Sequence, residues 1–158
     1  KVYASLEEQE GGLTMKILAT AALICLAAAS AVFAEGKTHY VAIHVNENDP
    51  ATMNMALNNA ENVNSYYTAQ GDSVVIEMVA YGPGLNMLIP GKSPVEQRVS
   101  AMSLEMPNLT FAACENTHRK MSEKAGKEIA LMEEANMVPS GVVRLIELQE
   151  NGFSYIRP

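Results

Sequence analysis

The chain has few cysteines, no tryptophan and a shortage of basic side chains. Its 158 residues include two cysteines, and 11 lysines and arginines stand against 18 aspartates and glutamates. Because an acidic surface repels the phosphate backbone, and no basic cluster offsets this repulsion, the composition argues against a nucleic-acid partner. The same charge argues against binding to anionic lipid surfaces.

The longest apolar run lies near the N-terminus. From Met15, one lysine precedes a run of apolar residues and then small residues, with Val32 and Ala34 at the positions that a signal peptidase inspects. This order predicts a signal peptide over residues 15–34, with a retained membrane anchor as the alternative. We therefore expect a periplasmic or secreted protein with no membrane contact after cleavage.

Residues 1–14 precede this predicted signal peptide. Their Glu-Glu-Gln-Glu-Gly-Gly run is what translation of a purine-rich ribosome-binding site would produce. We therefore interpret residues 1–14 as a mistranslated upstream segment and predict that synthesis begins at Met15.

The predicted mature domain covers residues 35–158. Its 124 residues are enough for one domain, and it keeps 9 of the 11 basic and 15 of the 18 acidic side chains, which gives a net charge of −6. Cys25 is removed with the signal peptide, so Cys114 is left alone and no internal disulfide is possible. An unpaired thiol in an exported protein is either buried, joined to another chain by a disulfide, or involved in the protein's chemistry.

Short apolar runs alternate with helical patterns along the mature domain. Strands are predicted over residues 39–45, 73–80, 109–114, 137–138 and 153–156. Helices are predicted from Pro50, from Pro94 and just after Cys114, with a further piece over 127–135 and a last helix opened by Pro139-Ser140-Gly141. This alternation is typical of β-α-β units, so we predict an α/β fold. It would be a three-layer sandwich with a mainly parallel sheet of about five strands.

Two of these helices carry clear start motifs. Asp49-Pro50 combines a capping residue with a proline at the first helical position. Ser93, Pro94 and Glu96 have the spacing of a capping box, which predicts that the second of these helices begins at Pro94.

Cys114 is the last residue of the third predicted strand. Ligand sites of open parallel sheets lie outside the carboxyl ends of the strands, so the thiol falls at that edge. A helix that begins near Asn116 directs N–H groups and a positive dipole end toward the sulfur, which favours the thiolate, and His118 on the first turn is placed to assist. A thiolate can accept sulfur as a persulfide without a second cysteine. The opposite interpretation is a buried, inert cysteine.

Other polar residues and turns fall at the same predicted edge. His44 is either a structural histidine of the core or a side chain that reaches this edge, and the turn Gly82-Pro83-Gly84 follows the second strand. We predict catalytic roles for Cys114 and His118. The predicted binding residues are His44, Asn46, Gly82, Asn86, Asn116 and Thr117.

Several segments together resemble the DsrE/DsrF-like family, small α/β proteins of sulfur metabolism, and in particular its exported single-domain members. The segments are VAIHVNE, ALNNAENV, VIEMVAYGPGLNML, FAACENTHRK and VPSGVVRLIELQENGFSYIRP. The resemblance implies a flavodoxin-like, three-layer fold, homo-oligomers, and a strand-end cysteine that carries sulfur, which matches Cys114. Downstream of Cys114, the residues Glu115 to His118 replace the small residues and the Arg-Gly pair that are common in the relay members.

Three functions follow from these observations. The first is an exported sulfur carrier that uses Cys114 as persulfide acceptor, exchanges sulfur with another protein or a small sulfur compound, and needs no cofactor or metal. The second is a non-catalytic oligomeric module for a small ligand or a protein. The third is a soft-metal binder, suggested by Met53 and Met55. Methionines two apart on a helix do not share a face, which favours core packing over metal binding.

Overall fold

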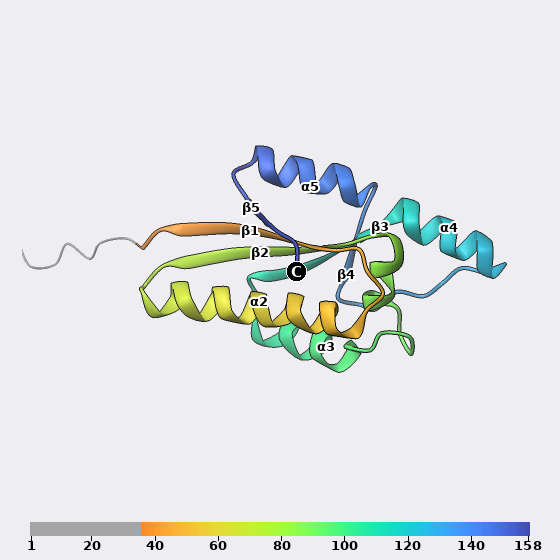
Figure 1. Cartoon of the computed structure of the whole chain (residues 1–158), viewed down its shortest axis with the longest axis horizontal. Helices are drawn as coiled ribbons and strands as arrows, with labels where there is room; N and C mark the ends of the chain where they lie inside the picture. Colours follow the sequence, from red (N-terminus) through yellow and green to blue (C-terminus); the bar gives the residue numbers. More distant parts are fainter. Residues whose placement is uncertain (1–35) are drawn as a thin grey trace, which may run out of the picture. The chain divides into compact units, whose positions relative to one another are not determined.

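A five-stranded, all-parallel sheet forms the centre of the structure, a computed structural model that describes residues 36–158 (Figure 1). The predicted upstream segment and signal peptide, residues 1–34, lie outside the described residues. The strands lie in the order β4-β3-β2-β1-β5. Their bounds are β1 Thr38–Val45, β2 Ser73–Ala80, β3 Leu109–Cys114, β4 Ala135–Val138 and β5 Ser154–Ile156.

Helices cover both faces of the sheet. Figure 1 shows α2 (Pro50–Ala69) and α3 (Glu96–Glu105) on one side and α5 (Gly141–Glu150) on the other. The 3-10 helix η1 (Gly82–Leu88) and helix α4 (Glu115–Ala125) lie at the end of the sheet where β2 and β3 finish. The α/β class and the three-layer arrangement predicted from the sequence are therefore confirmed. The strand order itself differs from the 2-1-3-4-5 order of flavodoxin.

Two apolar cores follow from the alternation of side chains along the strands. The larger core lies under α2 and α3, where β1 contributes Val41, Ile43 and Val45. The smaller core lies under α5, and the strands contribute only small or medium side chains to it. Its buried members are Ala42, Val79, Ala112, Leu145 and Leu148. The small strand residues let the α5 backbone approach the sheet closely, so this one helix packs directly over the central strands.

The start of α2 is formed by local sequence. Asp49 is the capping residue, and its Oδ2 accepts a hydrogen bond of 2.8 Å from the N–H of Thr52. Pro50 occupies the first helical position, where its missing N–H costs nothing. This prediction is confirmed.

One predicted helix is absent, and the predicted start of another is wrong. Residues 127–134 form no helix, because the N–H of Met132 donates to the carbonyl of Leu88 and the N–H of Ile129 donates to Ser122 Oγ. These contacts place Ile129 and Met132 in the interior in an irregular chain. Helix α3 begins at Glu96 instead of Pro94, and the Glu96 carboxylate accepts from the N–H of Gly91 at 2.7 Å, outside the predicted capping box.

Candidate functional site

Cys114 ends β3 at the carboxyl edge of the sheet. It pairs in register with Val138 of β4, and α4 begins at the next residue. Helix α5 follows β4 and covers one face of the sheet, whereas Met121 of α4 packs with the core on the other face. The carboxyl ends of β3 and β4 therefore meet beside the start of α4. Open α/β sheets form their ligand sites outside the carboxyl ends of their strands.

The sulfur of Cys114 is buried among hydrogen-bond donors. The residue is 4% exposed, and burial alone raises the pKa of its thiol. The hydroxyl of Thr117 and the N–H groups of Gly141, Thr117 and Asn116 oppose burial and hold the net pKa below its usual value. No side-chain hydrogen bond caps the start of α4. The arrangement favours a thiolate.

Thr117, three residues after Cys114, contacts the loop after β2. The N–H of Gly82 donates to Thr117 Oγ1 at 3.0 Å. Gly82 has a φ of +54°, a conformation that glycine adopts without strain. Gly84 lies against the end of β1, where an added Cβ would be 2.7 Å from the carbonyl carbon of Val45. The two glycines therefore fix the loop at the position where it meets Thr117.

Tyr81 lies between the start of α5 and His44. An added Cβ on Gly141 would be 2.8 Å from Cδ1 of Tyr81, so the ring packs directly on that glycine. On its other side the Tyr81 ring stacks on His44, with centroids 4.7 Å apart. Burial raises the pKa of Tyr81, the charge of Tyr155 raises it further, and the guanidinium of Arg157 opposes the rise. Tyr81 thus packs between Gly141 and His44.

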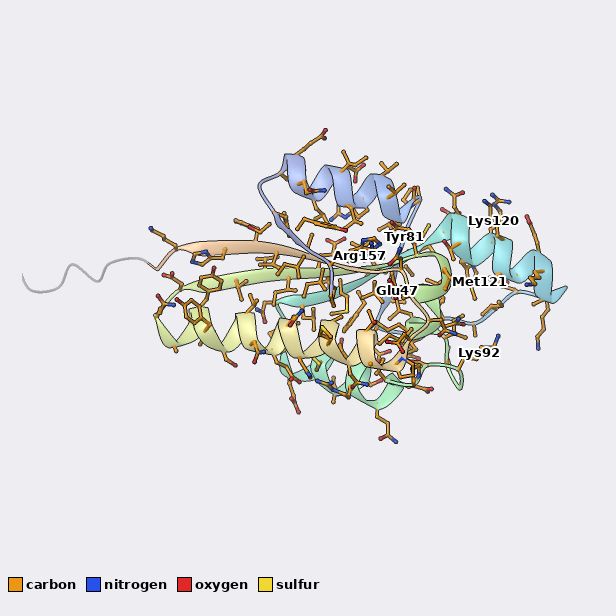
Figure 2. All side chains as sticks on the ribbon, in the orientation of Figure 1. Glu47, Tyr81, Lys92, Lys120, Met121 and Arg157 are labelled. Atoms are coloured by element: carbon orange, nitrogen blue, oxygen red, sulfur yellow. The ribbon has the colours of Figure 1, made fainter. Side chains whose placement is uncertain are left out.

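His44 is buried at the end of β1 and only partly satisfied. Its Nδ1 lies 2.6 Å from the hydroxyl of Tyr155 on β5, but its Nε2 has no hydrogen-bond partner within residues 36–158. Burial lowers the pKa of His44, and the guanidinium of Arg157 lowers it further, so the ring is favoured as neutral. Arg157 pairs with Glu47 at 2.8 Å, and Figure 2 shows both beside Tyr81 at the carboxyl edge.

His118 does not join the sulfur as the sequence predicted. Its Nε2 lies 2.6 Å from the carbonyl oxygen of Ile129, and only a protonated ring nitrogen can donate to that oxygen. The histidine therefore holds the irregular segment after α4. A cavity of about 360 Å³ lies beside it, lined by His118, Glu128, Ile129, Ala130, Leu131 and Met137.

The other predicted binding residues lie near the edge in different roles. The N–H of Asn116 lowers the pKa of the Cys114 thiol, and the N–H of Gly82 donates to Thr117 Oγ1. Asn86 donates from its amide to the carbonyl of Pro83, which stabilises its own turn. Asn46 contacts the glycine loop through its backbone, where its Cα would lie 2.8 Å from a Cβ on Gly84.

Sequence reasoning missed Tyr81, Gly141 and Tyr155. Tyr81 and Gly141 are adjacent only because β2 and β4 end at the same edge, and Tyr155 reaches His44 from a residue 111 positions away. The one available indication was a glycine at the start of a helix, where a residue with better helix propensity is usual.

The structure also bears on metal binding. Within residues 36–158, no three His, Cys, Asp or Glu side chains are grouped as a metal site would require. Met53 is fully buried and Met55 is 49% exposed, so the two thioethers do not converge.

Among the helices of the described part of the chain, none is long and apolar enough to span a bilayer.

Comparison with known proteins identifies a relative but not an activity. No family model and no curated protein matches the chain. Among solved structures it is similar to MTH1491 from Methanobacterium thermoautotrophicum, a protein of unknown function, with 32% sequence identity and a TM-score of 0.62. The similarity covers 76% of this chain and 99% of that chain. At this identity and coverage, the chain belongs to the same protein family as MTH1491.

Proposed function

We propose that this protein is an exported sulfur carrier and that Cys114 accepts sulfur as a persulfide. The observation that carries the proposal is the position of Cys114 at the carboxyl edge of the sheet, where α4 begins at the next residue and neighbouring N–H and hydroxyl groups hold the pKa of the thiol below its usual value. A thiolate is the nucleophile in sulfur exchange. The resemblance of the Cys114 segment to the DsrE/DsrF-like family supports the same chemistry.

The transfer needs no oxidant. The Cys114 thiolate attacks the outer sulfur of a polysulfide or of thiosulfate, and a bond forms between Sγ and that sulfur. The S–S bond inside the donor breaks, and its electron pair leaves with the shortened polysulfide or with sulfite. The persulfide then passes its outer sulfur to the thiolate of an acceptor by the reverse exchange.

Sulfur loading should be visible as added mass. After incubation with polysulfide, we expect the purified protein to gain the mass of one sulfur atom and to lose it on treatment with a reducing thiol. Cys114→Ser should gain nothing. Because Cys114 is only 4% exposed, small inorganic donors should load faster than a protein-bound persulfide. Absence of loading across the pH range in which thiols ionise, or equal loading of Cys114→Ser, would show that the proposal is wrong.

A second proposal, self-association, is favoured by the α5 side of the sheet. All-parallel sheets are almost always covered on both faces, yet among residues 36–158 one helix covers this face. Apolar side chains remain exposed on it at fractions of 38–53%. They are Tyr40, Val75, Val142, Val143, Ile146 and Tyr155. A second copy of the chain, packed against α5, would cover the apolar side chains that the described residues leave exposed.

Charge placed on this surface should separate the copies. Ile146 is 50% exposed on the outer side of α5, so Ile146→Lys should convert the oligomer to monomer with little loss of fold stability. Leu104→Lys is the matched control, because Leu104 is 85% exposed on the opposite side of the sheet. Light scattering after size exclusion gives the mass directly. A wild-type monomer at all concentrations, or equal effects of both variants, would contradict self-association.

A further inference from the structure

A buried imidazole at the carboxyl end of β1 has one nitrogen with a partner and one without. His44 is 5% exposed, its Nδ1 lies 2.6 Å from the hydroxyl oxygen of Tyr155, and its Nε2 has no hydrogen-bond partner within residues 36–158. A charged imidazole would have two N–H donors, one of them buried without an acceptor, so the ring is neutral. The lowered pKa of His44, which burial and the guanidinium of Arg157 cause, agrees with this charge state.

The geometry also determines which nitrogen carries the single proton of the neutral ring. A neutral imidazole has one N–H donor and one bare acceptor nitrogen. In folded proteins a buried N–H without an acceptor is rarer than a buried acceptor without a donor, so the unpartnered Nε2 of His44 is the bare nitrogen. The Nδ1–H group therefore donates to the Tyr155 oxygen. The proton of the phenol cannot point at Nδ1 as well, so it points away from His44.

Aromatic contacts hold this pair of side chains in place. The His44 ring stacks on Tyr81 with centroids 4.7 Å apart, and the Tyr155 ring lies 5.8 Å from it, tilted by 45°. Tyr81 is itself packed on Gly141. Because Tyr155 is 43% exposed, a ligand from solvent can reach this side chain, whereas His44 is covered. Tyr155 is therefore a surface donor with a direction that a buried group fixes.

A cation lies next to this donor. Arg157 follows Tyr155 by two residues, the spacing that places side chains on the same side of an extended chain. The Arg157 side chain is 49% exposed and contacts the carboxylate of Glu47 at 2.8 Å. Exposed ion pairs of this kind are weak, so the guanidinium can exchange its partner for another anion. A hydroxyl donor and a guanidinium together suit the oxygen atoms of an oxyanion.

This donor pair lies on the same face of the sheet as the thiol. Ala42 of β1 and Ala112 of β3 both belong to the smaller core under α5. His44 and Cys114 follow these alanines by two residues, so their side chains share that face. Tyr155 pairs in register with Ala42 and points to the same side. An anion held by Tyr155 would therefore lie at the edge and on the face where the strand of Cys114 ends.

We propose that Tyr155 and Arg157 bind the oxyanion end of thiosulfate and that His44 is the positioning residue that directs the Tyr155 proton toward it. This role rests on the proposed function and names the sulfur donor for it. The oxygens of thiosulfate accept from the hydroxyl and the guanidinium while its outer sulfur is transferred to Cys114. A bond forms between Sγ and that sulfur, the S–S bond of thiosulfate breaks, and sulfite leaves with the electron pair.

Thiosulfate binding can be measured without sulfur transfer. Isothermal titration calorimetry on Cys114→Ser protein gives the dissociation constant, because no thiol is present in the domain to react. Tyr155→Phe in this background keeps the ring and loses the hydroxyl, and we expect at least about tenfold weaker binding. Glu47→Gln should act in the opposite direction and tighten binding about threefold, because the guanidinium loses a competing carboxylate.

Sulfur loading with Cys114 present tests the choice of donor. Polysulfide has no oxygen atoms, so Tyr155→Phe should load about tenfold more slowly from dilute thiosulfate and within about twofold of the wild type from polysulfide. His44→Asn keeps an N–H donor near the position of Nδ1 and should retain most of the thiosulfate loading. His44→Leu has no donor and should behave as Tyr155→Phe does. Circular dichroism identifies which variants are folded.

The protonation of His44 can be observed directly in long-range proton–nitrogen correlation NMR spectra of the wild type. A proton on Nε2, no thiosulfate binding by Cys114→Ser, or unchanged binding after Tyr155→Phe would show that the proposal is wrong. So would an equal loss of loading from thiosulfate and polysulfide, because Tyr155 would then act on the thiol and not on the donor. Thiosulfate binding that depends on Tyr155, in a protein whose Cys114 takes up no sulfur, would instead contradict the carrier function alone.

Discussion

Gly84→Ala is expected to destabilise the protein by about 3 kcal/mol and to raise the thiol pKa of Cys114. The added Cβ would overlap the carbonyl oxygen of Val45 and lie 2.7 Å from its carbon, and backbone atoms cannot rotate away. Overpacking of a buried site costs about 1–3 kcal/mol and sometimes more. The loop must shift, and the N–H of Gly82 would then lose its contact with Thr117.

Urea unfolding followed by circular dichroism gives the free energy of unfolding, and the pH dependence of iodoacetamide alkylation gives the thiol pKa. Gly91→Asn is the control, because Gly91 lies in the next loop with a φ of +70° and no atom within 4 Å of an added Cβ. Asparagine tolerates this conformation, so the cost should stay below about 1 kcal/mol. A Gly84→Ala protein as stable as the Gly91→Asn control would mean that the contact with Val45 is not as rigid as the structure indicates.

Arg144→Met is expected to cost about 2 kcal/mol of unfolding free energy. Arg144 of α5 makes two hydrogen bonds of 2.7 Å to the carboxylate of Glu77 on β2. The Glu77 side chain is 12% exposed, so loss of the guanidinium leaves a nearly buried charge without its partner. The cost is below that of a fully buried pair, because the Arg144 side chain is 35% exposed and water screens it.

A double substitution separates this penalty from lost packing. In Arg144→Met with Glu77→Gln no charge remains to be stranded, so we expect the pair to recover at least half of the lost free energy. Denaturant unfolding of the wild type, both single variants and the double variant completes the cycle. Equal stability of the single and double arginine variants would show that packing, and not the unpaired carboxylate, determines the loss.

The elements with local causes were predictable from the sequence. Helix α2 begins where Asp49-Pro50 predicts, because a cap and a proline act within one turn. The position of Cys114 at the end of β3 also followed from the chain, since an apolar run ended there. These features depend on neighbours in the sequence, which a single sequence displays.

The features that sequence reasoning missed depend on contacts between distant segments. Residues 127–134 lack the predicted helix because Leu88 and Ser122 capture their N–H groups. His118 contacts the carbonyl oxygen of Ile129 in this irregular segment, and no periodicity of the sequence predicts that contact. The packing of Tyr81 on Gly141 requires the relative placement of β2 and β4, which the sequence pattern leaves open.

The pairing of β1 with β5 joins the first and the last described strands of the chain. Val41 pairs with Ser154, whereas Asn116 and Thr117 lie only two and three residues after Cys114. Closing such a long loop is slow relative to forming one helical turn, because the entropy of the loop must be lost first. We therefore expect the first turn of α4, which carries Asn116 and Thr117, to form early in folding and the His44–Tyr155 contact to form last, and partial unfolding to undo them in the reverse order.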